Sequence, residues 1–200
     1  MGGKVMGEWP SVWGELPPDG TVLTTAEYLQ TAHSLRINEV IYGRLMVVEE
    51  SPLFRHQDLL LEIAILMRVF VGQHRLGTVC IAPQDVILDP ARALIVQPDL
   101  MFISHARQHI ISDHIWGAPD LVVEVMSPKP RIGKLEDRIG YFSQYGVKEC
   151  WLVHQLSREI EVLKLKKYGA DARRSFHGIQ TIESDVLPDF KISPELLACS

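Results

Sequence analysis

The stretch Q97-P-D-L-M-F-I-S104 is followed by G117-A-P-D-L-V-V-E-V-M-S-P. Both contain short apolar runs of strand type that are bounded by Pro and Gly. Each run carries one carboxylate where an apolar residue is expected: Asp99 at the head of the first and Glu124 inside the second. We therefore predict two central strands, each with an acidic side chain.

Glu124 lies in a run that is apolar on both faces, as a strand covered on both sides requires; its neighbours are Leu121, Val122, Val123, Val125 and Met126. Burying an unpaired charge is costly, so this carboxyl must be neutral, paired with a cation or bound to a metal. If the two strands are adjacent, the carboxyls of Asp99 and Glu124 face each other across roughly 5 Å, which suits a shared Mg²⁺. A core salt bridge, for example between Glu124 and Arg138, is the alternative.

Helices are predicted at four places from caps and from apolar residues at helical spacing. A short helix begins after Thr24 or Thr25 and runs to about His33. A long helix covers about 52–74, with Ser51 as its N-cap and Pro52 at its first position. A basic helix covers about 132–145, and a short helix near the end of the chain begins at Ser193 and Pro194.

The remaining apolar runs predict strands. Residues 39–50 are expected to form one strand or a tight hairpin. Further strands are predicted at 78–82, 85–88, 98–104, 121–126, 149–154 and 160–167. Because four of them follow one another closely, they favour an antiparallel meander over repeated βαβ units. The expected fold class is α+β, with a central mixed, mostly antiparallel sheet flanked by helices.

Length and composition are those of one ordinary globular domain: 200 residues, of which 46% are hydrophobic and 22% charged. We expect residues 1–20 to form an irregular lead-in and residues 21–200 a single domain. No apolar stretch reaches the length of a membrane span or of a signal-peptide core, so we expect a cytoplasmic protein. The cysteines, Cys80, Cys150 and Cys199, are odd in number and far apart, which favours core thiols over a disulfide or zinc site.

The net charge of −5 argues against coating of nucleic acid by the whole surface. It is compatible with a site that concentrates carboxylates beside a local basic surface. Lys129, Arg131, Lys134 and Arg138 form one basic group, which could hold a DNA backbone. A second group, formed by Lys164, Lys166, Lys167, Arg173 and Arg174, is better explained as the solvated face of a hairpin.

Several phrases of the chain occur in an order that resembles a known family. They are T24-T-A-E-Y-L, E39-V-I-Y-G, S51-P-L-F-R-H-Q, A82-P-Q-D-V-I-L, the two runs quoted above, G146-V-K-E-C-W-L-V and S184-D-V-L-P-D-F. From about Thr24 to Leu197 the sequence is similar to the Uma-two family of restriction endonucleases. That resemblance implies the PD-(D/E)XK nuclease fold, DNA as the partner, and Mg²⁺ (or Mn²⁺) as the cofactor for phosphodiester hydrolysis.

The resemblance also implies which residues form the site. The acidic positions of the family fall on Glu39, Asp99 and Glu124, with Asp99 and Glu124 as metal ligands and Glu39 binding a second metal or orienting a water. Without the resemblance, Glu39 is better explained as a solvated carboxylate at a strand end. A homodimer is expected from nuclease analogy alone.

The basic position departs from the family pattern. Nucleases of this fold often carry Lys two residues after the Glu, but Met126 occupies that place. In the family the lysine lies on the following helix, in an acidic-x-x-x-Lys-x-x-x-Tyr arrangement, whose places fall here on Lys134, Arg138 and Phe142. Lys134 and Arg138 share a helix face, and either could supply the cation. Only Lys134 could act as a base, because a guanidinium stays protonated. The rival prediction is therefore a degenerate nuclease-fold module that binds nucleic acid or a protein partner without cleavage.

Other polar residues have two interpretations each. His56 could approach the metal or a phosphate, or bond to a neighbouring backbone group at the start of its helix. Asp85 could be an outer-shell carboxylate or an edge-strand charge. His105, His109 and His114 lie on one loop-like stretch; His105 and His109 with Asp113 could bind a transition metal, but exposed loop histidines fit the sequence better.

Overall fold

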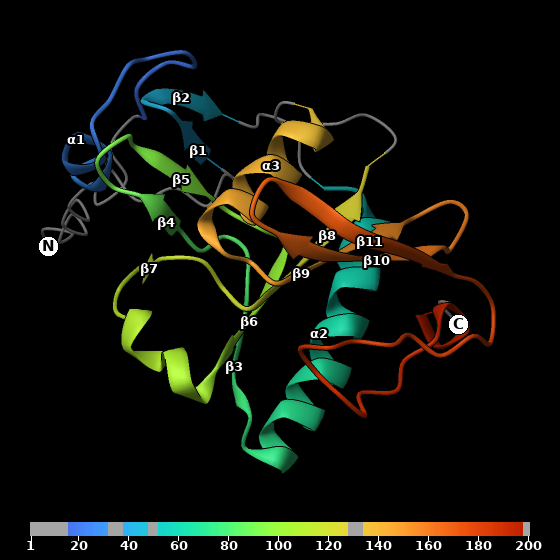
Figure 1. Cartoon of the computed structure of the whole chain (residues 1–200). Helices are drawn as coiled ribbons and strands as arrows, with labels where there is room; N and C mark the ends of the chain where they lie inside the picture. The colour runs from blue at the N-terminus through green and yellow to red at the C-terminus, as the bar shows by residue number, and fades with distance from the viewer. Residues whose placement is uncertain (1–15, 32–37, 48–51, 128–133, 198–200) are drawn as a thin grey trace, which may run out of the picture.

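The computed structural model describes residues 16–31, 38–47, 52–127 and 134–197. Two sheets and two long helices make up this part of the chain (Figure 1). The predicted lead-in lies mostly in residues 1–15, outside the described residues. The α+β class with mixed sheets flanked by helices is confirmed.

The larger sheet has the strand order β11-β10-β9-β8-β6-β3. Its strands are β3 (Gly77–Ile81), β6 (Leu100–Ser104), β8 (Leu121–Met126), β9 (Glu149–His154), β10 (Ile160–Lys166) and β11 (Gly169–Phe176). Strand β8 pairs with β6 in antiparallel and with β9 in parallel, and the other neighbouring pairs are antiparallel. Leu100 pairs with Val123, and continuing this register brings Asp99 opposite Glu124.

Two helices cover the two faces of this sheet. Helix α2 (Phe54–His74) packs on the face that includes Val123 and Val125, while α3 (Leu135–Tyr145) packs on the face that includes Val122 and Leu152. Since side chains alternate along a strand, Glu124 lies on the α3 face. Helix α3 also connects β8 to β9, which is why this pair can be parallel.

The smaller sheet has the order β2-β1-β5-β4-β7, and helix α1 (Thr25–Leu29) packs beside it. Its strands are β1 (Asn38–Ile41), β2 (Arg44–Val47), β4 (Val86–Asp89), β5 (Leu94–Val96) and β7 (Ile115–Trp116). Residues 38–47 form a tight hairpin, the second of the two predicted forms. Its turn needs left-handed backbone at both central residues, Tyr42 with φ of 49° and Gly43 with φ of 86°.

Some details differ from the sequence predictions. The meander holds for β3, β6 and β8, but β4 leaves it and joins the smaller sheet. Helix α1 keeps the Thr24 cap, completed by a capping box with Glu27, yet it ends at Leu29. Helix α2 starts at Phe54 with Leu53 at its N-cap and no side-chain cap; Ser51 lies outside the described residues. Short 3-10 helices form at His105–Ile110, predicted as a loop, and at Pro194–Leu197.

Candidate active site

Four elements bring the predicted acidic and basic side chains to one place. Asp99, just before β6, and Glu124, on β8, lie on adjacent strands. Glu39 comes from β1 of the other sheet and is fully buried. Arg138 comes from α3 and contacts two of these carboxylates. Glu39 is thus buried, and its interpretation as a solvated strand-end charge is wrong.

Arg138 is the centre of the charge network. Its Nε donates to Glu124 Oε1 at 2.8 Å, and its Nη1 donates to both carboxylate oxygens of Glu39 at 2.7 Å. Nη2 reaches the backbone oxygen of Gln97 at 3.3 Å, and the guanidinium lies 5.4 Å from the ring centre of Phe142. The Glu124–Arg138 salt bridge, one of the two alternatives for Glu124, is therefore present.

The ionisation of this cluster is strongly perturbed. Burial raises the pKa of Glu124 to about 8; Arg138 opposes the rise, while the nearby charges of Asp99 and Glu39 add to it. Burial alone would lower the pKa of Arg138, but Glu124 and Glu39 raise it well above its usual range. Two carboxyls, Glu39 and Glu124, therefore contact one guanidinium, and Asp99 lies beside Glu124 on the neighbouring strand.

Asp99 is held from two sides. Its Oδ2 accepts the backbone N–H of Val125 at 2.7 Å and lies 3.2 Å from Nε2 of His56. His56 is 5% exposed, and its buried Nδ1 has no hydrogen-bond partner among the described residues. Nε2 is thus the ring nitrogen that faces Asp99. Of the two interpretations of His56, the structure thus supports the one that brings it to the site.

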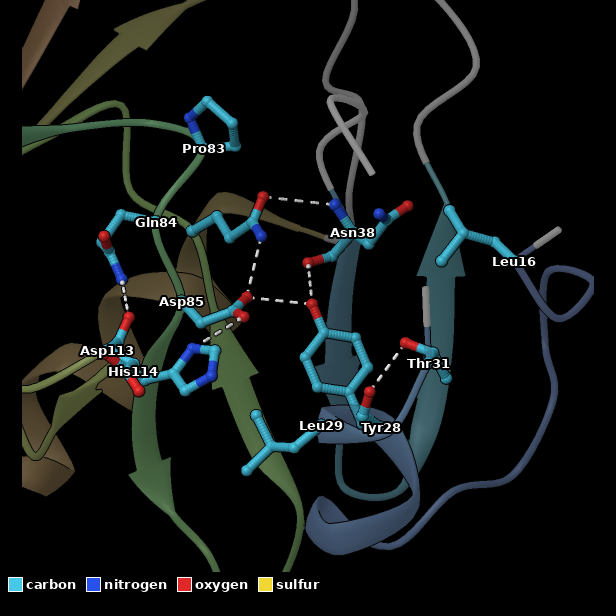
Figure 2. A pocket seen from close by; sticks show the side chains of 11 residues that line it. Leu16, Tyr28, Leu29, Thr31, Asn38, Pro83, Gln84, Asp85, Asp113 and His114 are labelled. Atoms are coloured by element: carbon cyan, nitrogen blue, oxygen red, sulfur yellow. Dashed lines mark hydrogen bonds and ion pairs between the residues drawn. The ribbon is translucent and has the colours of Figure 1, made fainter. Parts of the chain in front are cut away.

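Gln97 connects the cluster to a second polar layer, shown in Figure 2. Its backbone N–H donates to Glu39 Oε1 at 2.7 Å, and its side-chain amide donates to Asp85 Oδ1 at 2.8 Å. Asp85 also accepts from the Tyr28 hydroxyl at 2.9 Å and lies 3.3 Å from Nδ1 of His114. Asp85 therefore lies in the second polar layer and is connected to Glu39 through Gln97.

The contribution of Tyr28 to the stability of this second polar layer can be measured. Burial and the neighbouring Asp85 raise its pKa far above its usual value, so the hydroxyl stays protonated and donates. Tyr28→Phe removes this bond but leaves Asp85 with Gln97 and His114. We expect the free energy of unfolding to fall by about 1–2 kcal/mol, measured by urea denaturation. Tyr168→Phe, at an 86% exposed tyrosine, should change it by less than about 0.5 kcal/mol. Equal effects of the two substitutions would contradict this role.

Lys134, the other candidate cation, does not enter the cluster. It is exposed, occupies the N-cap of α3, and makes no ion pair with another described residue. It lines a pocket whose floor includes Glu39 and Arg138. Lys134 thus lies at the approach to the carboxylates, whereas Arg138 lies between them.

The histidine group predicted as a possible metal site is not assembled. His105 and His109 are exposed on the 3-10 helix, and His114 pairs with Asp85 instead. In the described ranges, no group of three or more His, Cys, Asp or Glu side chains is arranged to hold a metal ion.

Two carboxylates nevertheless fit a magnesium ion. Asp99 and Glu124 supply the hard oxygen donors that Mg²⁺ prefers, and this ion keeps several waters of its own. Burial raises the pKa of Glu124 although Arg138 lowers it, so this carboxyl would gain from a further cation beside it. Glu39 fits a supporting role, because it holds Arg138 and accepts from Gln97.

The remaining basic and thiol groups agree with the structural interpretations. On the β10–β11 hairpin and its surroundings, Lys164, Lys166, Arg173 and Arg174 each pair with a carboxylate. Cys150 is buried and Cys80 partly buried; burial raises the pKa of both thiols. Lys129, Arg131 and Cys199 lie outside the described residues. Within the described residues, none of the helices has the length and apolar character that a bilayer span requires.

The fold of this chain is similar to that of a solved structure. A crystal structure from Anabaena variabilis ATCC 29413, described as a "putative nuclease belonging to DUF820", aligns with a TM-score of 0.75 at 16% sequence identity, over 88% of this chain and 97% of that chain. The likeness shows that this chain shares the α+β fold of that structure.

The particular family follows from the sequence. The family model Uma2, described as "Putative restriction endonuclease", matches residues 25–195. The chain therefore belongs to the Uma2 family. No curated protein sequence matches it at a significant level.

Proposed function

We propose that this protein is a metal-dependent DNA endonuclease that hydrolyses phosphodiester bonds. The observation that carries the proposal is the pair of carboxyls, buried Asp99 and partly buried Glu124, on adjacent strands with Arg138 beside Glu124. A nuclease-like fold and membership in a restriction-endonuclease family support it.

Asp99 and Glu124 are the proposed metal ligands, and Glu39 assists by holding Arg138. When bound, Mg²⁺ or Mn²⁺ would polarise a phosphoryl oxygen and lower the pKa of a bound water. His56 and the backbone N–H of Val125 fix the position of Asp99. Such support from neighbouring donors is what keeps a ligand oriented.

The two helix cations have different proposed roles. Arg138 keeps its proton, so it supplies fixed positive charge beside the phosphate as negative charge develops there. Lys134, at the approach to the carboxylates, can contact a backbone phosphate of the substrate. Position 126 on β8 carries Met where related nucleases often carry Lys. The positive charge beside the phosphate therefore comes from residues outside β8.

Cleavage of supercoiled plasmid and of single-stranded DNA, each with Mg²⁺, Mn²⁺ or EDTA, tests the proposal. We expect nicked or linear product with either metal and intact DNA in EDTA. Retention of DNA on the protein without cleavage in both metals would overturn the nuclease proposal.

That outcome would favour a degenerate nuclease-fold module that binds without cutting. One observation supports this second candidate: the guanidinium of Arg138 already bridges Glu39 and Glu124. Arg138 thereby supplies part of the positive charge that a metal ion would bring to these carboxylates.

A further inference from the structure

A pocket lies between the β1–β2 hairpin and helix α3, and it opens beside the carboxylate cluster. Glu39 pairs with Met46 and Ile41 pairs with Arg44, so these four side chains share one face of the hairpin. Lys134, Asp137, Arg138 and Tyr141 recur at spacings of three and four, and so share one face of α3. The two faces enclose about 140 Å³.

The lining of this pocket combines apolar walls with a charged rim. Ile41, Met46 and Tyr141 supply apolar and aromatic surface. Arg44 and Lys134 supply positive charge, and neither forms an ion pair with another described residue; Arg44 donates only to the backbone oxygen of Gly20, at 3.3 Å. Asp137 is the exposed acidic residue at the rim.

Aromatic rings continue the pocket toward the hairpin turn. Tyr42, at the turn, is 39% exposed and meets Tyr141 edge to face at 5.5 Å between ring centres. The guanidinium of Arg92 lies 4.3 Å from the ring centre of Tyr42. Rings and cations that alternate along a surface are what an unpaired nucleic-acid strand binds, through its base faces and its phosphates.

We propose that this pocket receives an unpaired nucleotide of the DNA strand, next to the phosphodiester bound at Asp99 and Glu124. The proposal rests on the proposed function and adds the form of the substrate. A flat, weakly polar base fits between Ile41, Met46 and Tyr141, while its phosphates reach Arg44 and Lys134. Arg138 lines the pocket and pairs with Glu124, so the pocket lies one side chain away from this proposed metal ligand.

A paired base could not enter, since its two faces are stacked and its edge is hydrogen-bonded inside the duplex. The site therefore takes a strand that is single, or that is locally opened with one nucleotide turned out. Duplex DNA without such an opening would contact Arg44 and Lys134 through phosphates alone.

Binding in EDTA tests this without cleavage. Short fluorescent oligonucleotides, single-stranded or duplex, are titrated with the full chain and with variants at two tyrosines. Tyr141→Leu keeps apolar bulk but removes the ring, Tyr141→Phe keeps the ring, and Tyr168→Leu removes an exposed ring that also has a lysine over it, on the β10–β11 turn. Far-ultraviolet circular dichroism and urea denaturation check that the variants fold.

We expect the unchanged chain to bind the single strand more tightly than the duplex. Tyr141→Leu should weaken single-strand binding by about 5- to 100-fold and leave duplex binding within about twofold. Tyr141→Phe and Tyr168→Leu should bind as the unchanged chain does. Equal losses for both DNA forms, no loss in Tyr141→Leu, or tighter duplex binding would overturn the pocket assignment alone. Binding of neither DNA form would also overturn the pocket assignment, whereas the proposed function is decided separately by the cleavage assay with Mg²⁺ or Mn²⁺.

Discussion

Glu124→Ala is expected to lower metal-dependent DNA cleavage by at least about 100- to 1,000-fold. The substitution removes one of the two proposed metal ligands and leaves Arg138 with Glu39 as its remaining carboxylate partner. The measurement is the initial rate of nicking of supercoiled plasmid in Mg²⁺ and in Mn²⁺, with the two proteins purified identically.

Glu161→Ala is the matched control for this substitution. Its side chain is 14% exposed, against 12% for Glu124, and it lies on β10 of the same sheet. Its partners, His154 and Arg173, do not contact the carboxylate cluster. Cleavage should therefore persist in Glu161→Ala. If Glu124→Ala nicks plasmid as fast as this control does, Glu124 does not belong to the catalytic site.

Arg138→Met is expected to destabilise the fold by about 3–5 kcal/mol, because it leaves buried carboxylates without their cation. Methionine keeps much of the volume of the arginine stem, so the loss reports the charge and its hydrogen bonds. The measurement is the free energy of unfolding from urea denaturation, in EDTA at neutral pH.

Two further variants separate charge pairing from general damage. Arg173→Met removes a guanidinium that is 53% exposed and pairs with Glu161 at 3.2 Å, and it should cost less than about 1 kcal/mol. In Arg138→Met, Glu39 is the most buried carboxylate left without its cation. Adding Glu39→Gln removes this charge and should recover part of the lost stability. An Arg138→Met loss no larger than that of Arg173→Met would contradict the central place of Arg138.

The fold was largely predictable because its strands and helices carry strong local patterns. The runs 98–104 and 121–126 are apolar enough to be central strands, and 52–74 and 132–145 show helical spacing. Strands β5 and β7 were missed because three and two residues are too few to show any alternation, and β11 was given no bounds, although a hairpin was expected there. Helix α2, predicted to begin at about residue 52, begins at Phe54 with Leu53 at its N-cap; Ser51, the predicted cap, lies outside the described residues.

The candidate site was less predictable, because its contacts connect distant parts of the chain. Arg138 and Glu39 are 99 residues apart, and nothing near Glu39 indicates that a cation will bury it. Only the family resemblance pointed to Glu39. Gln97, Tyr28 and His114 were not predicted as parts of the site for the same reason. Their shared partner, Asp85, is reached only through the fold.

The two predictions for Glu124, a salt bridge with Arg138 and metal binding, are compatible with each other. In the metal-free chain it pairs with Arg138, yet burial and the carboxylates around it still raise its pKa to about 8. Its folded pKa lies above the ordinary 4.5, so its contribution to stability is present below pH 4.5 and is lost as pH rises through 8. A bound divalent cation favours the ionised form instead and must displace the proton.

Titration of the chain with Mn²⁺ between pH 6 and pH 9, for wild type and Glu124→Gln, therefore tests the metal site most directly. Bound and free Mn²⁺ are separated by electron paramagnetic resonance. We predict that the wild-type affinity rises by up to about tenfold per pH unit below pH 8 and levels off above it, whereas Glu124→Gln binds weakly with no such rise. Equal affinities and equal pH dependence in the two proteins would contradict the assignment of Glu124 as a metal ligand.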